Sequence, residues 1–240
     1  MNIPGKLNRL IGQAIHSYNM LADGDRLLIA VSGGIDSLVL SMVLHNWRKK
    51  APINYELELV HIDMGVKEPP TESINQQLAR YNLSVERVDQ KTFSGNATLD
   101  AAGNTCFQCS RNRRTKLFSL ARERGCNKLA LGHHRDDLIE TFFINVLYSG
   151  NISTMVPAQP LFNGDLTVIR PLAFLSKEEV KELGEIFRLT PAAGDCPLSI
   201  TTKRDAVREI LADLSSSDPA VKGNIFNALS NVREDYLLKT

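Results

Sequence analysis

Strand-like segments alternate with segments of helical periodicity over the first 190 residues. The short apolar run 26–32 is the first of these strands, and 55–63, 85–89, 127–133 and 166–171 are the others, of which 85–89 has the weakest pattern. The spacing of apolar residues between them predicts helices at about 37–49, 72–80, 111–124 and 136–148. Strands that alternate with helices form βαβ units, so the sequence predicts an α/β fold with a mainly parallel, doubly wound sheet.

The two ends of the chain show helical patterns without strands. Apolar positions between residues 7 and 21 predict an amphipathic opening helix, and Ser176 with Glu179 forms the capping box of another helix. After residue 190 the apolar positions mark two helices, around 207–214 and 226–236. We therefore expect a main domain over 1–190 and a helical extension over 191–240. Two segments are predicted as loops, namely 91–105 and the stretch that holds prolines 157 and 160.

Composition says more about the expected cellular compartment of the protein than about its binding partners. No apolar run approaches the length of a membrane span, and the first ten residues lack the apolar core of a signal peptide. Four cysteines in such a chain favour ligand or catalytic roles over disulfides, so we expect a cytoplasmic protein without a membrane partner. The net charge of +1 means that any nucleic acid would bind a local basic patch.

The first predicted strand ends in the string SGGIDS, residues 32–37, directly before a helix. Glycines let a backbone approach an anion closely, and the following helix offers unpaired N–H groups. The serines add hydroxyl donors, whereas Asp36 would repel a phosphate and is expected to act through Mg²⁺. An ordinary turn with a capping serine is the alternative, but the complete string after a first strand favours a phosphate site.

This string resembles the loop of the PP-loop ATPases, which cleave ATP to AMP and pyrophosphate. The resemblance implies that His61 and Asp63, at the end of the second strand, lie beside adenine and ribose. Ligands of open α/β sheets bind at such strand ends. It also implies that the departing pyrophosphate is held by Ser32, Gly33, Gly34, Asp36 and Ser37.

The cysteines allow three readings when taken by themselves. Cys106 and Cys109 form a CxxC pair, and Cys196 lies far along the chain. Three thiolates can hold a [4Fe–4S] cluster with one open iron, whereas zinc would want a fourth ligand. Cys126 is a candidate for that fourth ligand, although it precedes a strand and is expected to be buried. Structural cysteines without a metal are the third reading.

Charged residues follow two of the predicted motifs. In GHHRDD, residues 132–137, we expect Gly132 and His133 at the nucleotide, Asp136 at Mg²⁺ and Asp137 in catalysis. Helix capping and burial are the alternatives for these side chains. A basic cluster follows the CxxC pair and would bind phosphates of ATP or RNA, with Arg113 expected in catalysis. Its members are Arg111, Arg113, Arg114 and Lys116.

The match to one family is closer than the match to the PP-loop ATPases in general. Four strings resemble the TtcA family, the tRNA-cytidine 2-sulfurtransferases: HSYNMLADGDRLLIAVSGG (16–34), CxxCSRxRR (106–114), GHHRDDLIETFFINVLYSG (132–150) and IRPLAF (169–174). The resemblance runs from about residue 7 to residue 196. It implies ATP, Mg²⁺ and a [4Fe–4S] cluster on Cys106, Cys109 and Cys196, with tRNA as substrate.

Two positions depart from the family pattern. Ile35 replaces a lysine that is common in the phosphate loop, so one loop cation is missing. Ser199 stands where many members have the second cysteine of a second CxxC, which leaves three cluster ligands in the chain. Both departures bear on the identity of the nucleoside more than on the chemistry.

The resemblance implies a reaction in two steps. ATP adenylates the C2 oxygen of a pyrimidine, and sulfide, supplied by a donor such as a cysteine desulfurase, then displaces AMP. An amide-forming ligase and a nucleotide-binding redox sensor without catalysis are the alternatives, as is a small metabolite in place of tRNA. The basic residues Lys203, Arg204 and Arg208 follow Cys196 and are expected to contact tRNA. A homodimer through the helical ends is compatible with the pattern.

Overall fold

The computed structural model describes residues 2–65, 70–90, 104–192 and 202–238, with the backbone alone for 104–107. The chain divides into two compact units. The first unit comprises residues 1–134 and 157–200, and the second comprises 135–156 and 201–240. Among the described residues, no helix combines the length and hydrophobicity that a membrane crossing requires.

The first unit is built on one six-stranded sheet with the order β3-β2-β1-β4-β6-β5. Its strands are β1 (Asp25–Ala30), β2 (Tyr55–Asp63), β3 (Glu86–Asp89), β4 (Lys128–Ala130), β5 (Ala158–Leu161) and β6 (Leu166–Ile169). All neighbours pair in parallel except β5 and β6, which are antiparallel. The predicted α/β fold with a mainly parallel sheet is confirmed.

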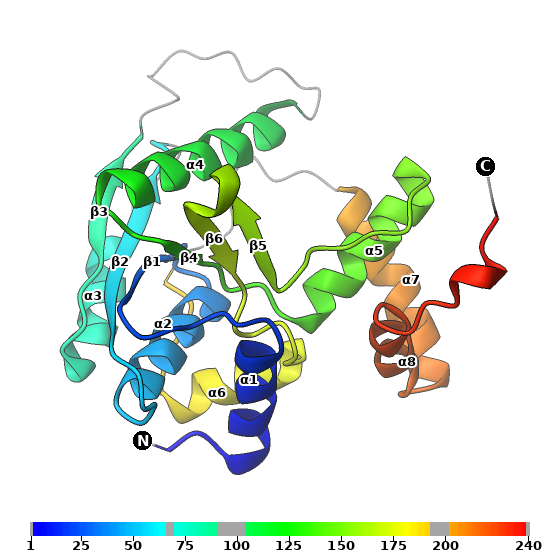
Figure 1. Ribbon diagram of the computed structural model, residues 1–240, viewed down its shortest axis with the longest axis horizontal. Helices are drawn as coiled ribbons and strands as arrows, with labels where there is room; N and C mark the ends of the chain where they lie inside the picture. The colour runs from blue at the N-terminus through cyan, green and yellow to red at the C-terminus, as the bar shows by residue number, and fades with distance from the viewer. Residues whose placement is uncertain (1, 66–69, 91–103, 193–201, 239–240) are drawn as a thin grey trace. The chain divides into compact units, whose positions relative to one another are not determined.

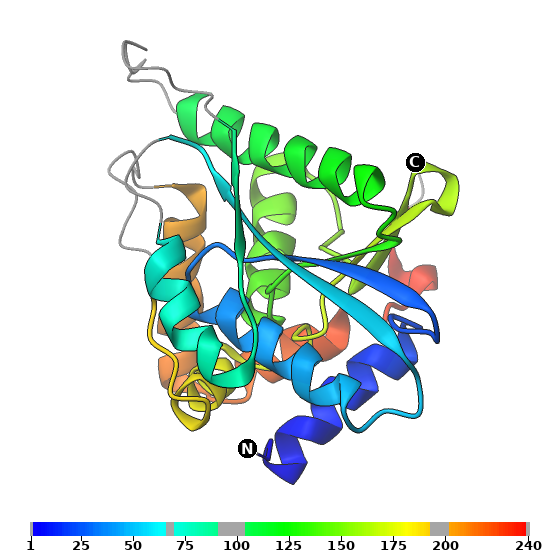
Figure 2. The same ribbon diagram turned by 90° about the vertical axis from the view of Figure 1, so that its left-hand side faces the viewer.

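Helices cover both faces of this sheet (Figures 1 and 2). One apolar core joins a face of the sheet to α1 (Gly5–Ser17), α2 (Ile35–Arg48), α3 (Thr71–Leu78) and α6 (Lys177–Ile186). A second apolar core joins the other face to α4 (Asn104–Glu123). Because apolar residues of β1, such as Leu27 and Leu28, point into different cores, its sequence is a continuous apolar run.

The second unit consists of helices. They are α5 (Arg135–Ser149), α7 (Lys203–Ser217) and α8 (Val221–Ala228). Ile139 of α5 packs with Val207 and Leu211 of α7 in a small core. Short 3₁₀ segments complete the described chain, η1 (Ala79–Tyr81) and η2 (Phe162–Gly164) in the first unit and η3 (Glu234–Tyr236) in the second.

Three predicted elements differ from the structure. The stretch around Pro160 was predicted as a loop but forms β5, because an edge strand tolerates a residue without an N–H. Helix α4 begins at Asn104, seven residues before the predicted start, since its polar first turns carry no apolar periodicity. The last predicted helix ends at Ala228, and η3 follows it within the described residues up to 238. The capping box at Ser176 and Glu179 is confirmed.

Candidate functional site

The phosphate loop lies between β1 and α2, at the carboxyl ends of the parallel strands. Gly33 has φ +89°, a conformation that side chains other than glycine rarely adopt. The Ser37 hydroxyl donates to the Gly34 carbonyl at 2.8 Å and accepts from the Ser32 N–H at 3.1 Å. The Ser32 hydroxyl accepts from the Gly34 N–H at 3.3 Å. These bonds shape a tight turn directly before α2, whose first N–H groups have no partner within the helix.

Two glycines elsewhere let other segments approach this loop closely. A Cβ on Gly132 would lie 2.9 Å from the backbone carbon and oxygen of Asp36, so the exit of β4 contacts the first turn of α2. A Cβ on Gly184 of α6 would lie 2.7 Å from Cδ1 of Ile35. Ile35 therefore packs on α6, which gives the residue in the usual lysine position an apolar role. The Ala192 N–H donates to the Gly33 carbonyl at 2.9 Å.

The end of β2 brings His61 and Asp63 to the same edge. Nδ1 of His61 lies 2.8 Å from the Val31 carbonyl, and because a carbonyl only accepts, Nδ1 carries the proton. Burial is the main cause that lowers the pKa of His61, and nearby Arg113 of α4 lowers it further. Asp63 accepts from Arg87 at 2.7 Å and from the Gly65 N–H at 2.8 Å. His61 is thus a neutral side chain with an acceptor at Nε2.

The ends of β4 and β6 add a second histidine and a buried arginine. Nε of Arg170 donates to Nδ1 of His133 at 3.3 Å. Burial lowers the pKa of Arg170 to about 10, and the charge of Arg114 on α4 contributes. The basic residues after the CxxC pair therefore act on the strand ends from α4, with Arg113 near His61 and Arg114 near Arg170.

The cysteines are described only in part. Cys109 of α4 is half-buried and packs against the apolar core that includes Val60 and Ile62 of β2. The side chain of Cys106 and the whole of Cys196 lie outside the described residues. Cys126 is buried, and its burial and the charge of Glu58 raise the pKa of its thiol to about 11. Such a thiol stays protonated near neutral pH, which agrees with the expected structural role of Cys126.

The remaining predicted residues belong to the second unit, where they form ion pairs. Asp136 accepts from Lys222 at 2.8 Å. Asp137 lies 3.4 Å from Arg204. Glu140, which the sequence did not single out, accepts from Arg204 at 2.9 Å and from Arg208 at 2.8 Å. The ammonium of Lys203 lies 4.7 Å from the centre of the Tyr148 ring. These contacts join α7 and α8 to α5.

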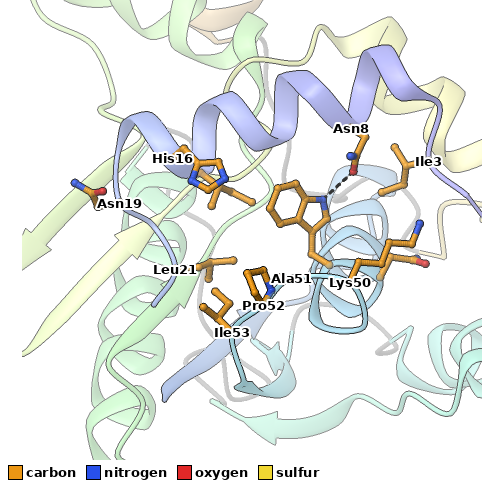
Figure 3. Close-up of a pocket in the computed structure, with 12 residues that line it drawn as sticks. Ile3, Asn8, His16, Asn19, Leu21, Lys50, Ala51, Pro52 and Ile53 are labelled. Atoms are coloured by element: carbon orange, nitrogen blue, oxygen red, sulfur yellow. Dashed lines mark hydrogen bonds between the residues drawn. The ribbon is translucent and has the colours of Figure 1, made fainter. Parts of the chain in front are cut away.

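A separate cavity lies between α1 and the end of α2 with the segment that follows it (Figure 3). Its volume is about 360 Å³, and Leu21, Pro52 and Ile53 provide apolar walls. The indole N–H of Trp47 donates to Asn8 at 3.1 Å, and both residues line the cavity. Since Leu21 and Ile53 precede β1 and β2, this cavity is at the opposite end of the strands from the phosphate loop.

Comparison with known proteins identifies the class first. A family model described as PP-loop domain matches residues 5–213. Two solved structures share the fold. The U34-tRNA thiolase NcsA from Methanococcus maripaludis, solved with its [4Fe–4S] cluster, gives a TM-score of 0.78 at 23% identity over 98% of this chain and 82% of its own. NAD⁺ synthetase from Burkholderia pseudomallei gives 0.53 at 17% identity, over 100% and 91%. The chain is a PP-loop protein.

Sequence relatives narrow this class. A protein of Anaeromyxobacter sp. strain K is 38% identical over 97% of this chain and 81% of its own length. Proteins of Syntrophotalea carbinolica and Geobacter sulfurreducens are 36% and 35% identical, each over 97% of this chain and over 91% and 92% of their own lengths. All three are named tRNA-cytidine(32) 2-sulfurtransferase. The chain belongs to this family, as the sequence motifs predicted.

Proposed function

We propose that the chain converts a tRNA cytidine to 2-thiocytidine in an ATP-dependent reaction. The geometry of the phosphate loop carries the proposal, since Gly33 and Gly132 allow a close backbone approach at the start of α2. The names of the relatives, which specify cytidine 32, support the choice of nucleoside and position. The fold shared with a U34-tRNA thiolase agrees with this reaction class.

The residues of the loop fit the activation step. The C2 oxygen of cytidine attacks the α-phosphorus of ATP, the bond to the β-phosphate oxygen breaks, and pyrophosphate leaves. The N–H groups at the start of α2 and the hydroxyls of Ser32 and Ser37 would stabilise the charge on pyrophosphate. Asp36 in the first turn of α2 would hold Mg²⁺, which prefers carboxylate oxygen. Sulfide then adds at C2, and AMP leaves with the former C2 oxygen.

We also propose that Cys106, Cys109 and Cys196 hold a [4Fe–4S] cluster. When bound, the cluster would supply an iron with an open position for sulfide, whose source would be a cysteine desulfurase. Half-burial of Cys109 against the apolar core that includes Val60 and Ile62 offers the apolar surroundings that suit such a cluster. Cys196 follows Ala192 by four positions in the sequence, and the Ala192 N–H donates to the Gly33 carbonyl of the phosphate loop.

Nucleoside analysis of tRNA from a deletion strain tests the proposal. Mass spectrometry should show the loss of 2-thiocytidine, and the intact gene should restore it. A gene with Asp36→Ala should not restore it, whereas Asp165→Asn, an exposed carboxylate in the β5–β6 turn, should do so fully. Unchanged 2-thiocytidine in the deletion strain would exclude the proposed product. Loss of another thionucleoside instead would keep the chemistry and change the base.

A further inference from the structure

Arg170 is a buried cation to which the proposed chemistry assigns no role. Its side chain follows β6, and the residue is only 6% exposed. Its N–H donates to the Pro157 carbonyl at 2.8 Å, and its carbonyl accepts from the Ala173 N–H at 3.0 Å. These backbone bonds already fix the turn after β6 without help from the guanidinium. Because burial of a cation is unfavourable, the contacts of the guanidinium must offset that cost, and one of them is with His133.

The contact between Arg170 and His133 fixes the protonation of the imidazole. A guanidinium has donors only, and Arg170 stays charged near neutral pH because its pKa remains at about 10. Nδ1 of His133 must therefore be the acceptor of the 3.3 Å bond. A neutral imidazole with a free lone pair on Nδ1 carries its proton on Nε2. His61 has the opposite arrangement, because its Nδ1 donates to Val31.

His133 is also held beside the phosphate loop. Its neighbour Gly132 is in contact with the backbone of Asp36 and of Ser37, where an added Cβ would come within 2.9 and 3.0 Å. The two strand ends that carry His133 and Arg170 are neighbours, because Ala130 of β4 pairs with Ile169 of β6. His133 therefore lies at the edge of the sheet where the loop would bind phosphate under the proposed function.

We infer that Arg170 is a positioning residue that holds His133 as a neutral imidazole and aims its Nε2–H at a phosphate oxygen of the nucleotide. The second half of the inference rests on the proposed function, since ATP is the nucleotide. The first half, the tautomer, does not depend on it. A doubly protonated His133 would lose the Nδ1 lone pair and with it the bond from Arg170, so the contact selects one form of the side chain.

Nitrogen NMR on protein labelled with ¹⁵N-histidine tests the tautomer without tRNA. The chain has five histidines, and the His133→Gln spectrum assigns the signals of His133. We expect Nδ1 unprotonated and Nε2 protonated in the wild type, and a mixture of tautomers in Arg170→Met, which keeps the apolar stem. Arg9→Met, an exposed arginine on α1, is the matched control and should leave the signals unchanged. Addition of ATP with magnesium chloride should shift the Nε2 signal.

A double-mutant cycle on pyrophosphate release tests the positioning role. Arg170→Met should lower kcat/KM about tenfold to hundredfold. This is the usual effect of losing a residue that orients a ligand-binding side chain. In a His133→Gln background the same change should have less than about a threefold effect, because Arg170 then has no imidazole to orient. Arg170→Lys should restore part of the activity.

The outcomes separate this inference from the proposed function. A protonated Nδ1 in the wild type, unchanged signals in Arg170→Met, or independent effects in the cycle would each overturn the role of Arg170. If Arg170→Met does not fold, the wild-type tautomer and a cycle with Arg170→Lys give the decision. An enzyme with the expected tautomer and coupling but without thiolated product would instead refute the proposed function.

Discussion

In the first unit, Arg124 has acidic neighbours, whereas Arg170 has a basic neighbour, Arg114. Arg124, just after α4, donates to Glu86 at 2.7 Å and to Glu58 at 3.2 Å, and the bonds to Glu86 are the main cause that raises its pKa. Arg170, at the carboxyl ends of the strands, has its pKa lowered by burial and by Arg114. A cation that is paired with carboxylates stabilises the fold. Cations that lie close to one another favour the binding of an anion. This difference favours the strand ends around Arg170 as the proposed anion site.

Cations of the second unit are paired with carboxylates, as Arg124 is. Arg204 and Arg208 both donate to Glu140, whose side chain is only 7% exposed. Lys222 pairs with Asp136 in the same unit. A basic run in the sequence therefore does not by itself identify an RNA surface, because part of its charge serves to join α7 to α5. The cations of α4 are the better candidates for phosphate contacts.

The largest effect is expected from Gly132→Ala. The added Cβ would meet the Asp36 backbone at 2.9 Å and push the phosphate loop away from β4. Pyrophosphate release with tRNA should fall at least about a hundredfold, as misplacement by an ångström commonly does. The control is Gly223→Ala in α8, where the new Cβ meets nothing within 4 Å. Equal activity of the two variants would show that the contact with β4 does not matter.

A smaller effect is expected from replacing Arg114, which lies near Arg170, and it should differ in kind from the effect of replacing Arg124. Arg114→Met removes a cation near Arg170, so we expect the apparent affinity for ATP to fall about tenfold with unchanged urea stability. Arg124→Met removes the pairs with Glu58 and Glu86, so we expect about 1 kcal/mol less stability and normal ATP kinetics. Urea unfolding and steady-state kinetics on both variants check this. A loss of stability in Arg114→Met together with a loss of ATP affinity in Arg124→Met would contradict the comparison.

The sequence predicted the elements whose signal is local and left the site contacts open. The bounds of β2 were predicted correctly, because its alternating apolar residues and its apolar second half give a local strand signal. Strand β5 was missed, since pairing with β6 rather than its own composition makes it a strand. Arg170 was visible only as a letter of the IRPLAF string. Nothing local indicates that it meets His133, which is 37 positions away.

The salt dependence of tRNA binding should sharpen the comparison with the second unit. Arg111 is exposed on α4, so Arg111→Gln should weaken tRNA binding and reduce the slope of log affinity against log salt by about one. Lys203 lies over the Tyr148 ring, so Lys203→Gln should change the slope less. Filter binding over a range of salt concentrations measures both. A larger change for Lys203 would return the RNA surface to the second unit.

The smallest effect near neutral pH is expected at Cys126, the cysteine on the side of Arg124. Its folded pKa is raised to about 11 from the usual 9.0, so the unfolded chain loses this proton first. The thiol therefore contributes stability that is fully present below pH 9 and is lost as the pH rises towards 11. Cys126→Ala should remove this part of the alkaline decline in urea stability. The difference between the variant and the wild type separates it from the contributions of other groups.

At pH 7.5 the Cys126→Ala variant should bind as much iron as the wild type, since the proposed cluster uses other cysteines. Cys126 in the folded protein should also resist iodoacetamide at pH 8, whereas half-buried Cys109 in iron-free protein should react. Rapid alkylation of Cys126, or loss of iron in Cys126→Ala, would show that this cysteine belongs to the functional end of the sheet.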